Sequence, residues 1–355
     1  MQKRIISLDF LRGFCALSVA IAHFGMANNY LVHSGEVIAS TAVEIFFILS
    51  GFVLAPQILL CLKSDFFENF KVFLIRRWMR TIPPFVISLT IISLYTGNLF
   101  NESFFKYLFF VKSFFSINNN DYFPIAWSLA VEEWFYIIFI PVVFFLRRIS
   151  LSFFTIILLY VLLFFFVKLL FFSLSNDDLR RITFFRLDSI VFGFLLFLVI
   201  NKVSNIVINL FHNNFKIILI ISSLLIVVSS KMVISNPKPI WLLVYIYFTS
   251  IFGMFIVFIL VRKNHLFESL KILKLFSIYS GALSYSLYLF HPIILIIVEQ
   301  YEFNSISIKF LLYILGTIFL ASIVRYFYEI EILRSRPNYQ NKNFIEINKK
   351  VFERQ

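Results

Sequence analysis

The stretch SLDFLRGFCALSVAIAHFGMA, residues 7–27, carries Asp9, Arg12 and His23, although it is long and apolar enough to cross a membrane as one helix. A charged side chain inside hydrocarbon costs roughly 2.5–3.5 kcal/mol on insertion scales, so these groups are expected to face the protein interior or water. Arg12 and His23 are 11 residues apart, which points both the same way and separates them by about 16 Å along the axis. The alternative is an Asp9–Arg12 ion pair and a hydrogen-bonded histidine that only pack this helix against others.

Composition places the whole chain in a membrane. Of its 355 residues, 60% are hydrophobic and 14% charged, whereas soluble domains average roughly 45–50% and about 25%. The net charge is +13, but the basic residues lie in short loops between apolar runs. This pattern favours a lipid bilayer and an anionic small molecule as partners, and no nucleic acid. Cys15 and Cys61 lie in apolar runs, so a disulfide framework is not expected.

Apolar runs of span length predict an all-α, polytopic transmembrane helical bundle. The ten runs are 7–27, 41–61, 81–97, 127–146, 151–175, 182–200, 217–234, 240–261, 276–298 and 308–328. The shorter run 104–115 predicts an interfacial or re-entrant helix. With the N-terminus inside, 22 Lys and Arg fall in inside segments and seven in outside segments, which predicts that both termini are cytoplasmic. No cleavable signal peptide is expected, because the first run is of span length and contains Arg12.

The segment RRWMRTIPP, residues 76–84, is predicted to form a loop at the cytoplasmic mouth, with Pro83 and Pro84 starting the next span. Its three arginines are Arg76, Arg77 and Arg80. Arginine suits bidentate phosphate contacts, so one interpretation is an anion clamp. The other is an ordinary positive-inside anchor.

Two adjacent glutamates, Glu132 and Glu133, lie near the predicted outer end of the run 127–146. Neighbours on a helix point about 100° apart, so at most one can share a pocket with His23. One of them could orient or activate the histidine. The other could pair with one of three arginines farther along the chain, Arg180, Arg181 or Arg186.

The run 276–298 contains GALSYSLYLFHPIIL, which brings Tyr288 and His291 next to Pro292. Proline removes one backbone hydrogen bond and usually kinks a helix, which makes room for polar contacts. His291 is therefore either a second functional histidine or a satisfied core group.

The remaining ionisable residues suggest no further site. Arg186 and Asp188 are expected to neutralise each other. His33, His212 and His265 lie in predicted loops and are interpreted as solvated. The sequence contains no glycine-rich phosphate loop, HExxH motif or Cys/His metal spacing, so no metal is expected. A Ser-His-Asp triad cannot be assigned, because no nucleophile-elbow context is present.

Six segments follow one another along the chain: LDFLRG, EIFFILSGFVLA, RRWMRTIPPF, WSLAVEEWFY, FRLDSIVFG and YSLYLFHPIIL. In this order they resemble the acyltransferase-3 family, integral membrane acyltransferases that modify cell-surface carbohydrates and related acceptors. With a weaker match at RYFYEIEILR, the resemblance covers about residues 5–334. The chain departs from the pattern at Glu44, where the family often has Asp. It also departs at Glu331, because a proline commonly follows the terminal glutamate, here Glu329.

This resemblance implies acyl transfer, most often of acetyl, from cytosolic acyl-CoA to a hydroxyl on the outer side. The protein would be a multi-pass protein of the cell (inner or cytoplasmic) membrane. The acceptor would be a cell-envelope polysaccharide or its lipid-linked precursor, so the reaction belongs to polysaccharide biosynthesis. Four arginines would hold the anionic CoA head group at the inner mouth, namely Arg12, Arg76, Arg77 and Arg80.

The resemblance also implies a catalytic group near the outer face. His23 would act as general base on the acceptor hydroxyl. Glu132 or Glu133 could fix its tautomer, and Tyr288 or His291 could stabilise the tetrahedral oxyanion. A two-step route through a transient acyl-enzyme stays open.

We therefore expect a transmembrane acyltransferase domain over residues 1–334 and a short polar cytoplasmic tail over 335–355, too short for an appended catalytic domain. One alternative is a transporter or exporter of a glycan or small anion that uses the same buried charges as a pathway. A second is a regulatory scaffold, in which the intramembrane polar residues would tolerate apolar replacement.

Overall fold

The computed structural model describes residues 4–62, 65–115, 121–171, 174–202, 214–235 and 238–337, without the side chains of residues 33, 176–178, 329 and 333. Every regular element in these ranges is helical. Within the described residues, ten helical segments are long and apolar enough to cross a membrane, which confirms the predicted all-α polytopic class. Nine of them are the helices α1 (Ile6–Ala27), α2 (Val32–Cys61), α3 (Phe66–Tyr95), α5 (Ala126–Arg148), α6 (Phe153–Leu170), α10 (Phe215–Ser235), α11 (Pro239–Arg262), α13 (Lys271–Glu299) and α14 (Ile306–Val324).

The tenth segment combines two elements, the 3₁₀ helix η1 (Thr183–Arg186) and α8 (Val191–Lys202). The remaining short elements are α4 (Glu102–Leu108), α7 (Asn176–Arg181), α12 (Asn264–Ser269), the π-helix η2 (Arg325–Glu329) and α15 (Ile330–Arg334). Only the first part of the predicted interfacial helix at 104–115 is helical, as α4. The Asn101 side chain caps α4 by accepting from the Phe104 N–H at 2.8 Å.

The prediction that residues 76–84 form a loop is wrong. These residues lie in the middle of α3, which runs without a break through Pro83 and Pro84. Membrane helices tolerate internal proline because neighbouring helices and side chains compensate the lost backbone bond. The arginines of this segment therefore lie along a helix that packs inside the bundle, against α2 and α13.

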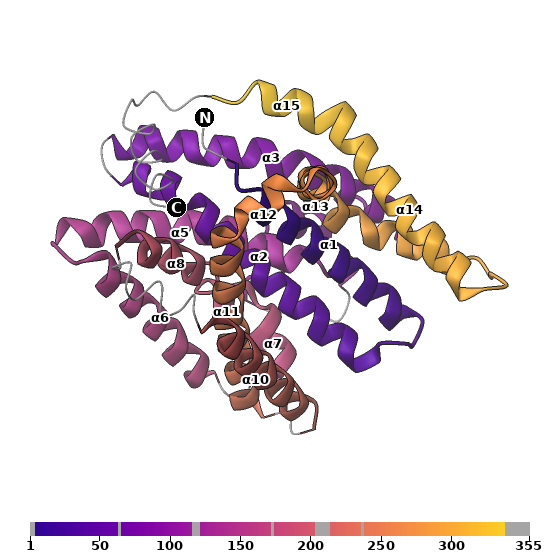
Figure 1. Cartoon of the computed structure of the whole chain (residues 1–355). Helices are drawn as coiled ribbons and strands as arrows, with labels where there is room; N and C mark the ends of the chain where they lie inside the picture. The colour runs from indigo at the N-terminus through magenta and orange to yellow at the C-terminus, as the bar shows by residue number, and fades with distance from the viewer. Residues whose placement is uncertain are drawn as a thin grey trace.

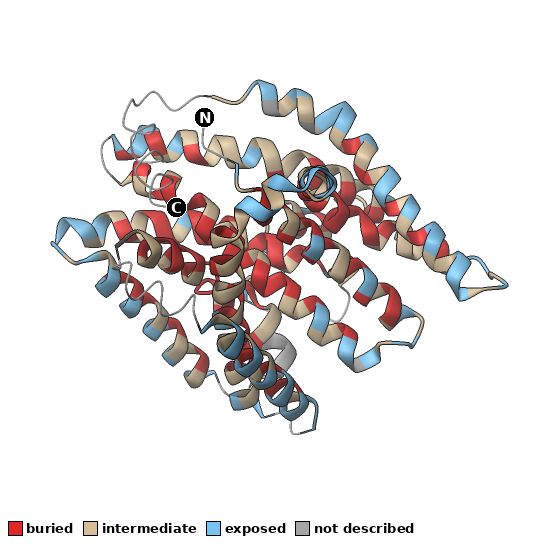
Figure 2. Ribbon diagram, in the orientation of Figure 1, coloured by how far each residue is buried: buried red, intermediate tan, exposed pale blue. Residues whose placement is uncertain are grey.

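Helices α1, α2 and α13 form the centre of the bundle (Figure 1). α1 packs against α2 and α13, and α2 packs in turn against α8 and α11. Figure 2 shows buried residues in the middle and exposed ones along α10 and α14. Exposed apolar side chains such as Leu224 of α10 and Phe319 of α14 fit contact with lipid, which cannot hydrogen-bond a polar surface.

Gly51 of α2 and Gly193 of α8 let two backbones touch. A Cβ placed on Gly51 would lie 2.0 Å from the Ile190 carbonyl oxygen, and one on Gly193 would lie 2.0 Å from that of Ile48. Small residues allow such approach in membrane helix pairs. The crossing fixes the rotation of α2, which presents residues to both cavities described below.

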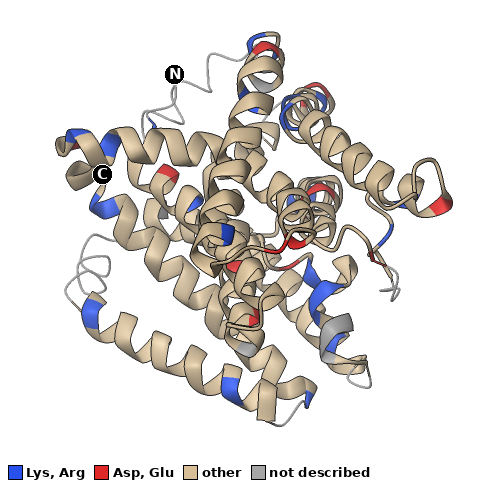
Figure 3. Ribbon diagram, turned by 90° about the vertical axis from the view of Figure 1, so that its right-hand side faces the viewer, with Lys and Arg blue, Asp and Glu red and all other residues tan. Residues whose placement is uncertain are grey.

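Charged residues lie near helix ends and in the middle of the bundle, while most of the helical surface is uncharged (Figure 3). Lys168 and Asp188 form a buried ion pair at 2.7 Å, and Tyr247 donates to Asp188 at 3.0 Å. Arg186 pairs instead with Glu44, where both side chains are buried. The prediction that Arg186 and Asp188 neutralise each other is therefore wrong, because each residue has a different partner.

Several predicted features fall on parts of the chain that are not described. The side chains of His33 and Glu329, the whole of His212 and the tail beyond residue 337 lie outside the described residues. His265 is exposed, as predicted, but it lies in the helix α12 and not in a loop. Glu331, the second departure from the family pattern, pairs with Arg334 on the exposed surface of α15.

Candidate active site

Two cavities lie along α1 and meet at Val43 and Tyr288, which line both. The first, called the Arg12 cavity, has a volume of about 80 Å³. Its polar lining includes Arg12, Ser50, Arg77, Arg80, Glu132 and Tyr288. The second, called the His23 cavity, has a volume of about 340 Å³. Its polar lining includes His23, Glu36, Ser40, Arg180, Arg181 and Tyr288.

Arg12 has no hydrogen-bond or ion-pair partner among the described residues. Asp9, three residues earlier on α1, pairs with Arg4 instead. The Asp9–Arg12 pair considered as an alternative is therefore not formed. An unpaired guanidinium inside a membrane helix is costly and indicates function, so the Arg12 cavity is suited to an anionic ligand.

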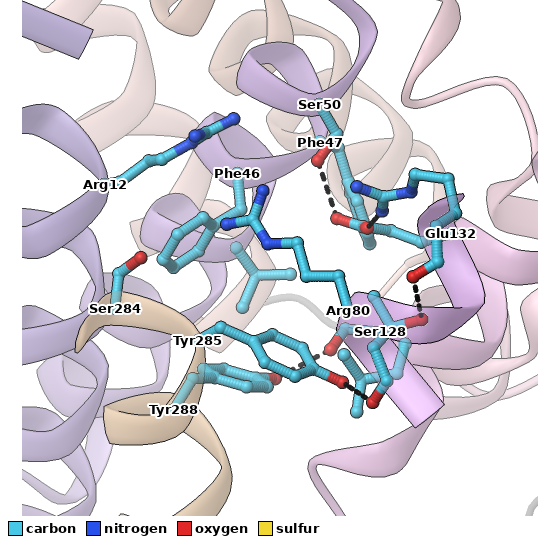
Figure 4. A pocket seen from close by; sticks show the side chains of 14 residues that line it. Arg12, Phe46, Phe47, Ser50, Arg80, Ser128, Glu132, Ser284, Tyr285 and Tyr288 are labelled. Atoms are coloured by element: carbon cyan, nitrogen blue, oxygen red, sulfur yellow. Dashed lines mark hydrogen bonds and ion pairs between the residues drawn. The ribbon is translucent and has the colours of Figure 1, made fainter. Parts of the chain in front are cut away.

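Other arginines add to the positive charge of the Arg12 cavity. Arg77 pairs with Glu132 at 2.7 Å, and Ser50 donates to the other oxygen of the same carboxylate at 2.7 Å. Figure 4 shows Arg12 and Arg80 reaching into the pocket from different helices, with Tyr285 and Tyr288 below them. Three arginines thus share this lining with one carboxylate.

Glu133 and Arg76 line neither cavity. Glu133 accepts hydrogen bonds from Trp78 and Thr81 of α3, each at 3.0 Å. Arg76 donates to the Pro337 carbonyl. Of the two adjacent glutamates, only Glu132 faces a cavity, as helix geometry requires. Glu133 instead ties α5 to α3.

His23 and His291 form a hydrogen-bonded pair, with 2.8 Å between His23 Nδ1 and His291 Nε2. His291 Nδ1 lies 3.2 Å from the Leu287 carbonyl, which can only accept, so in the neutral ring this nitrogen carries the proton. His291 Nε2 is then an acceptor, and His23 Nδ1 is the donor. His23 Nε2 is left as an unprotonated base on a residue that lines the His23 cavity.

This geometry corrects two expected roles. Glu132 bonds to α2 and α3 and Glu133 bonds to α3, so the hydrogen-bond partner of His23 is His291 and not a glutamate. His291 is fully buried and lines neither cavity. Because both of its ring nitrogens are engaged, it has no N–H to offer to an oxyanion.

Tyr288 lies between the two cavities. Its hydroxyl is 2.7 Å from Ser128 Oγ on α5, and its ring centroid is 5.8 Å from that of His291, one turn later on α13. Of the two residues considered as oxyanion donors, Tyr288 is the one whose side chain reaches the cavities.

A family model described as an acyltransferase domain matches residues 5–326. The chain belongs to this acyltransferase family. Its match spans the helices that build both cavities, α1, α2, α3, α5 and α13. The resemblance seen in the sequence is therefore confirmed, and the protein is an integral membrane member of an enzyme family.

Two curated proteins are similar in sequence to part of this chain. The peptidoglycan O-acetyltransferase OatA of Listeria monocytogenes serovar 1/2a is 28% identical over 154 residues, which cover 39% of this chain and 24% of that protein. The putative peptidoglycan O-acetyltransferase YrhL of Bacillus subtilis is 31% identical over 156 residues, or 39% and 23%. The match thus spans about a quarter of each relative's length. No solved structure matches the chain.

One charged residue of the His23 cavity was not singled out from the sequence. Glu36 lines the His23 cavity and pairs with Arg180 and Arg181, the latter at 3.2 Å. The sequence places Glu36 in a loop, because the second span was predicted to begin at residue 41 and α2 begins at Val32. The apolar residues directly after Glu36 in GEVIAS are the signal that could have extended the helix.

Proposed function

We propose that this protein is a membrane O-acyltransferase that moves an acyl group from cytosolic acyl-CoA to a hydroxyl of a cell-envelope polysaccharide or its lipid-linked precursor, in the inner (cytoplasmic) membrane. Membership of the acyltransferase family supports the reaction class. Both relatives are named as peptidoglycan O-acetyltransferases, one of them putatively. Acetyl is therefore the first acyl group to test, and peptidoglycan is the first acceptor to test. The observation that carries the proposal is an unpaired arginine and an available imidazole on one helix, facing two cavities with a common wall.

The Arg12 cavity would receive the donor. Phosphate groups suit the planar fork of arginine, and Arg12 and Arg80 reach into this space (Figure 4). A volume of about 80 Å³ is well below the roughly 300–1,000 Å³ of whole-ligand sites. The nucleotide would therefore stay at the cytoplasmic entrance, with only the thin thioester arm inside the protein.

His23 would act as the general base. Its Nε2 takes the proton of the acceptor hydroxyl as the hydroxyl oxygen bonds to the acyl carbon. The C–S bond then breaks, and the CoA thiolate takes the proton back from His23. The Tyr288 hydroxyl, once released from Ser128 and the Ile125 carbonyl, would donate to the tetrahedral oxyanion, since this side chain borders both the donor and the acceptor spaces.

His23→Ala tests this proposal in cells that lack the native protein. Surface glycans from cells with the wild-type chain should differ by the mass of one acyl group from those of cells without it, as measured by mass spectrometry. The His23→Ala variant should lack this mass difference while the glycan still reaches the surface. His265→Ala, which changes an exposed histidine on α12, is the matched control and should retain it.

The same experiment separates the enzyme from the transporter. A transporter would lose glycan export in the His23→Ala variant, whereas an enzyme loses only acylation. No acyl difference in any envelope fraction between cells with and without the wild-type chain would overturn the proposal.

A further inference from the structure

The wall between the two cavities lies where transfer has to occur. His23 faces one side of it and Arg12 the other, and Val43 and Tyr288 are the residues common to both linings. Val43 is 6% exposed and Tyr288 7% exposed. A thioester held in the Arg12 cavity is thus separated from the imidazole that would activate its attacker.

Ser128 holds Tyr288 in this wall. Its hydroxyl lies 2.7 Å from the Tyr288 hydroxyl and donates to the Ile125 carbonyl at 3.0 Å. Ser128 is itself 6% exposed. The Tyr288 hydroxyl also donates to the Ile125 carbonyl at 3.3 Å. Both bonds join α13 to α5 across the boundary, so opening the wall at Tyr288 requires that they break.

α13 is weakened at the same position. Pro292 has no N–H, so the backbone bond that would reach the carbonyl of Tyr288, four residues earlier, is missing. Proline positions in membrane helices are common sites of kinks. The turn that carries Tyr288 is therefore held by its side chain, while its backbone lacks one helical hydrogen bond.

Water has access to the acceptor side. The Glu36 and Arg181 side chains that line the His23 cavity are 46% and 31% exposed, and the cavity is large enough for several waters at about 340 Å³. A water beside His23 Nε2 could lose a proton to it and attack a thioester as readily as a sugar hydroxyl does. Exclusion of water from a reactive donor is a known use of active-site closure.

We infer that the Ser128–Tyr288 hydrogen bond latches a gate, formed by Tyr288 and Val43, which keeps the donor thioester away from His23-activated water until an acceptor is bound. The inference rests on the proposed function. The reaction that the gate suppresses is thioester hydrolysis. In it, water gives a proton to His23 and its oxygen to the acyl carbon, the C–S bond breaks, and CoA leaves as the thiol with that proton.

Ser128→Ala and Val43→Ala test the gate in purified, membrane-reconstituted protein supplied with acetyl-CoA and no acceptor. The release of free CoA thiol is measured. Loss of one hydrogen bond shifts a two-state equilibrium by roughly three- to tenfold, so Ser128→Ala should raise the hydrolysis rate by about that factor. Val43→Ala opens the wall from its other side without touching the hydrogen bond and should also raise hydrolysis. Adding His23→Ala to either variant should abolish the increase.

Ser93→Ala is the matched control. Ser93 is buried and lies 3.0 Å from the Tyr122 hydroxyl, so the variant loses an equivalent Ser–Tyr bond away from the cavities and should hydrolyse like wild type. If either gate variant elutes as folded protein and hydrolyses acetyl-CoA no faster than wild type, the gate is overturned. Failure of the proposed function is a separate result, in which the wild-type protein releases no CoA even when a glycan acceptor is present.

Discussion

Asp9 lies three residues before Arg12 on α1, yet it pairs with Arg4. This choice of partner leaves the Arg12 guanidinium in its cavity without a hydrogen bond among the described residues. Arg77, in contrast, is held by Glu132. Two arginines that line the same cavity therefore have different roles, one available to a ligand and one neutralised in place.

Arg12→Gln should raise the KM for acetyl-CoA by roughly ten- to a hundredfold, because hydrogen bonds from a charged donor contribute about 1.5–3 kcal/mol. Steady-state kinetics on reconstituted protein measure the effect. Arg334→Gln, which removes an arginine exposed at 72%, is the control and should leave KM unchanged. An unaltered KM in Arg12→Gln would remove Arg12 from the donor site.

His291→Ala should lower kcat by about a hundredfold with little change in the KM for acyl-CoA, because a small misorientation of a catalytic group can cost that much. In the proposed mechanism His291 acts through its hydrogen bond to His23, as a positioning residue. His291→Gln keeps a side-chain carbonyl that can accept from His23 Nδ1, so it should recover part of the lost kcat. Equal activity of the Ala and Gln variants would contradict this role.

The sequence allowed the placement of Arg12 and His23 to be predicted, but not their partners. Helix periodicity alone places the two residues on one side of α1. His291 reaches His23 from 268 residues away, and such neighbours depend on how helices pack. Periodicity contains no information about that packing, so Glu132 and Glu133 were wrongly considered as partners of His23.

At the scale of helices, hydropathy predicted where spans lie better than where they begin. α3 was predicted from residue 81 and begins at Phe66, because its first turns carry charges and its middle carries two prolines. α2 begins at Val32 rather than residue 41. Polar residues at a helix end lower the hydropathy of a window without ending the helix, so a hydropathy profile shortens such spans.

Gly193→Ala should lower the free energy of unfolding by about 1–3 kcal/mol, the usual range for overpacking. The added Cβ would lie 2.0 Å from the Ile48 carbonyl oxygen, and backbone cannot move aside easily. Thermal denaturation of the detergent-solubilised protein measures the loss. Gly316→Ala is the control, because its Cβ would meet only the Ile294 side chain, at 3.2 Å, and no backbone atom. A melting temperature equal to that of wild type would mean that α2 and α8 are not tightly packed there.

At the scale of the molecule, the distribution of basic residues predicts that both termini are cytoplasmic. This orientation stays a prediction. It determines which cavity faces the cytosol, and therefore whether Arg12 or His23 lies on the side where acyl-CoA is made.

Single cysteines test this orientation. Asn304→Cys, before α14, should react with a membrane-impermeant thiol reagent in intact cells, whereas Ser269→Cys, at the end of α12, should react only after the cells are permeabilised. Both positions are exposed. The native Cys15 and Cys61 are buried and unpaired, so they should give little background. The reverse labelling pattern would invert the predicted direction of acyl transfer.

The wall formed by Val43 and Tyr288 also has a consequence for the ion permeability of the membrane. A catalyst that handles one substrate from each compartment needs a path across the bilayer, and a path open along its whole length would conduct protons and dissipate the electrochemical gradient. In the proposed gate, the two side chains that line both cavities interrupt that path. Acyl groups could then cross the membrane while its ion gradients are preserved.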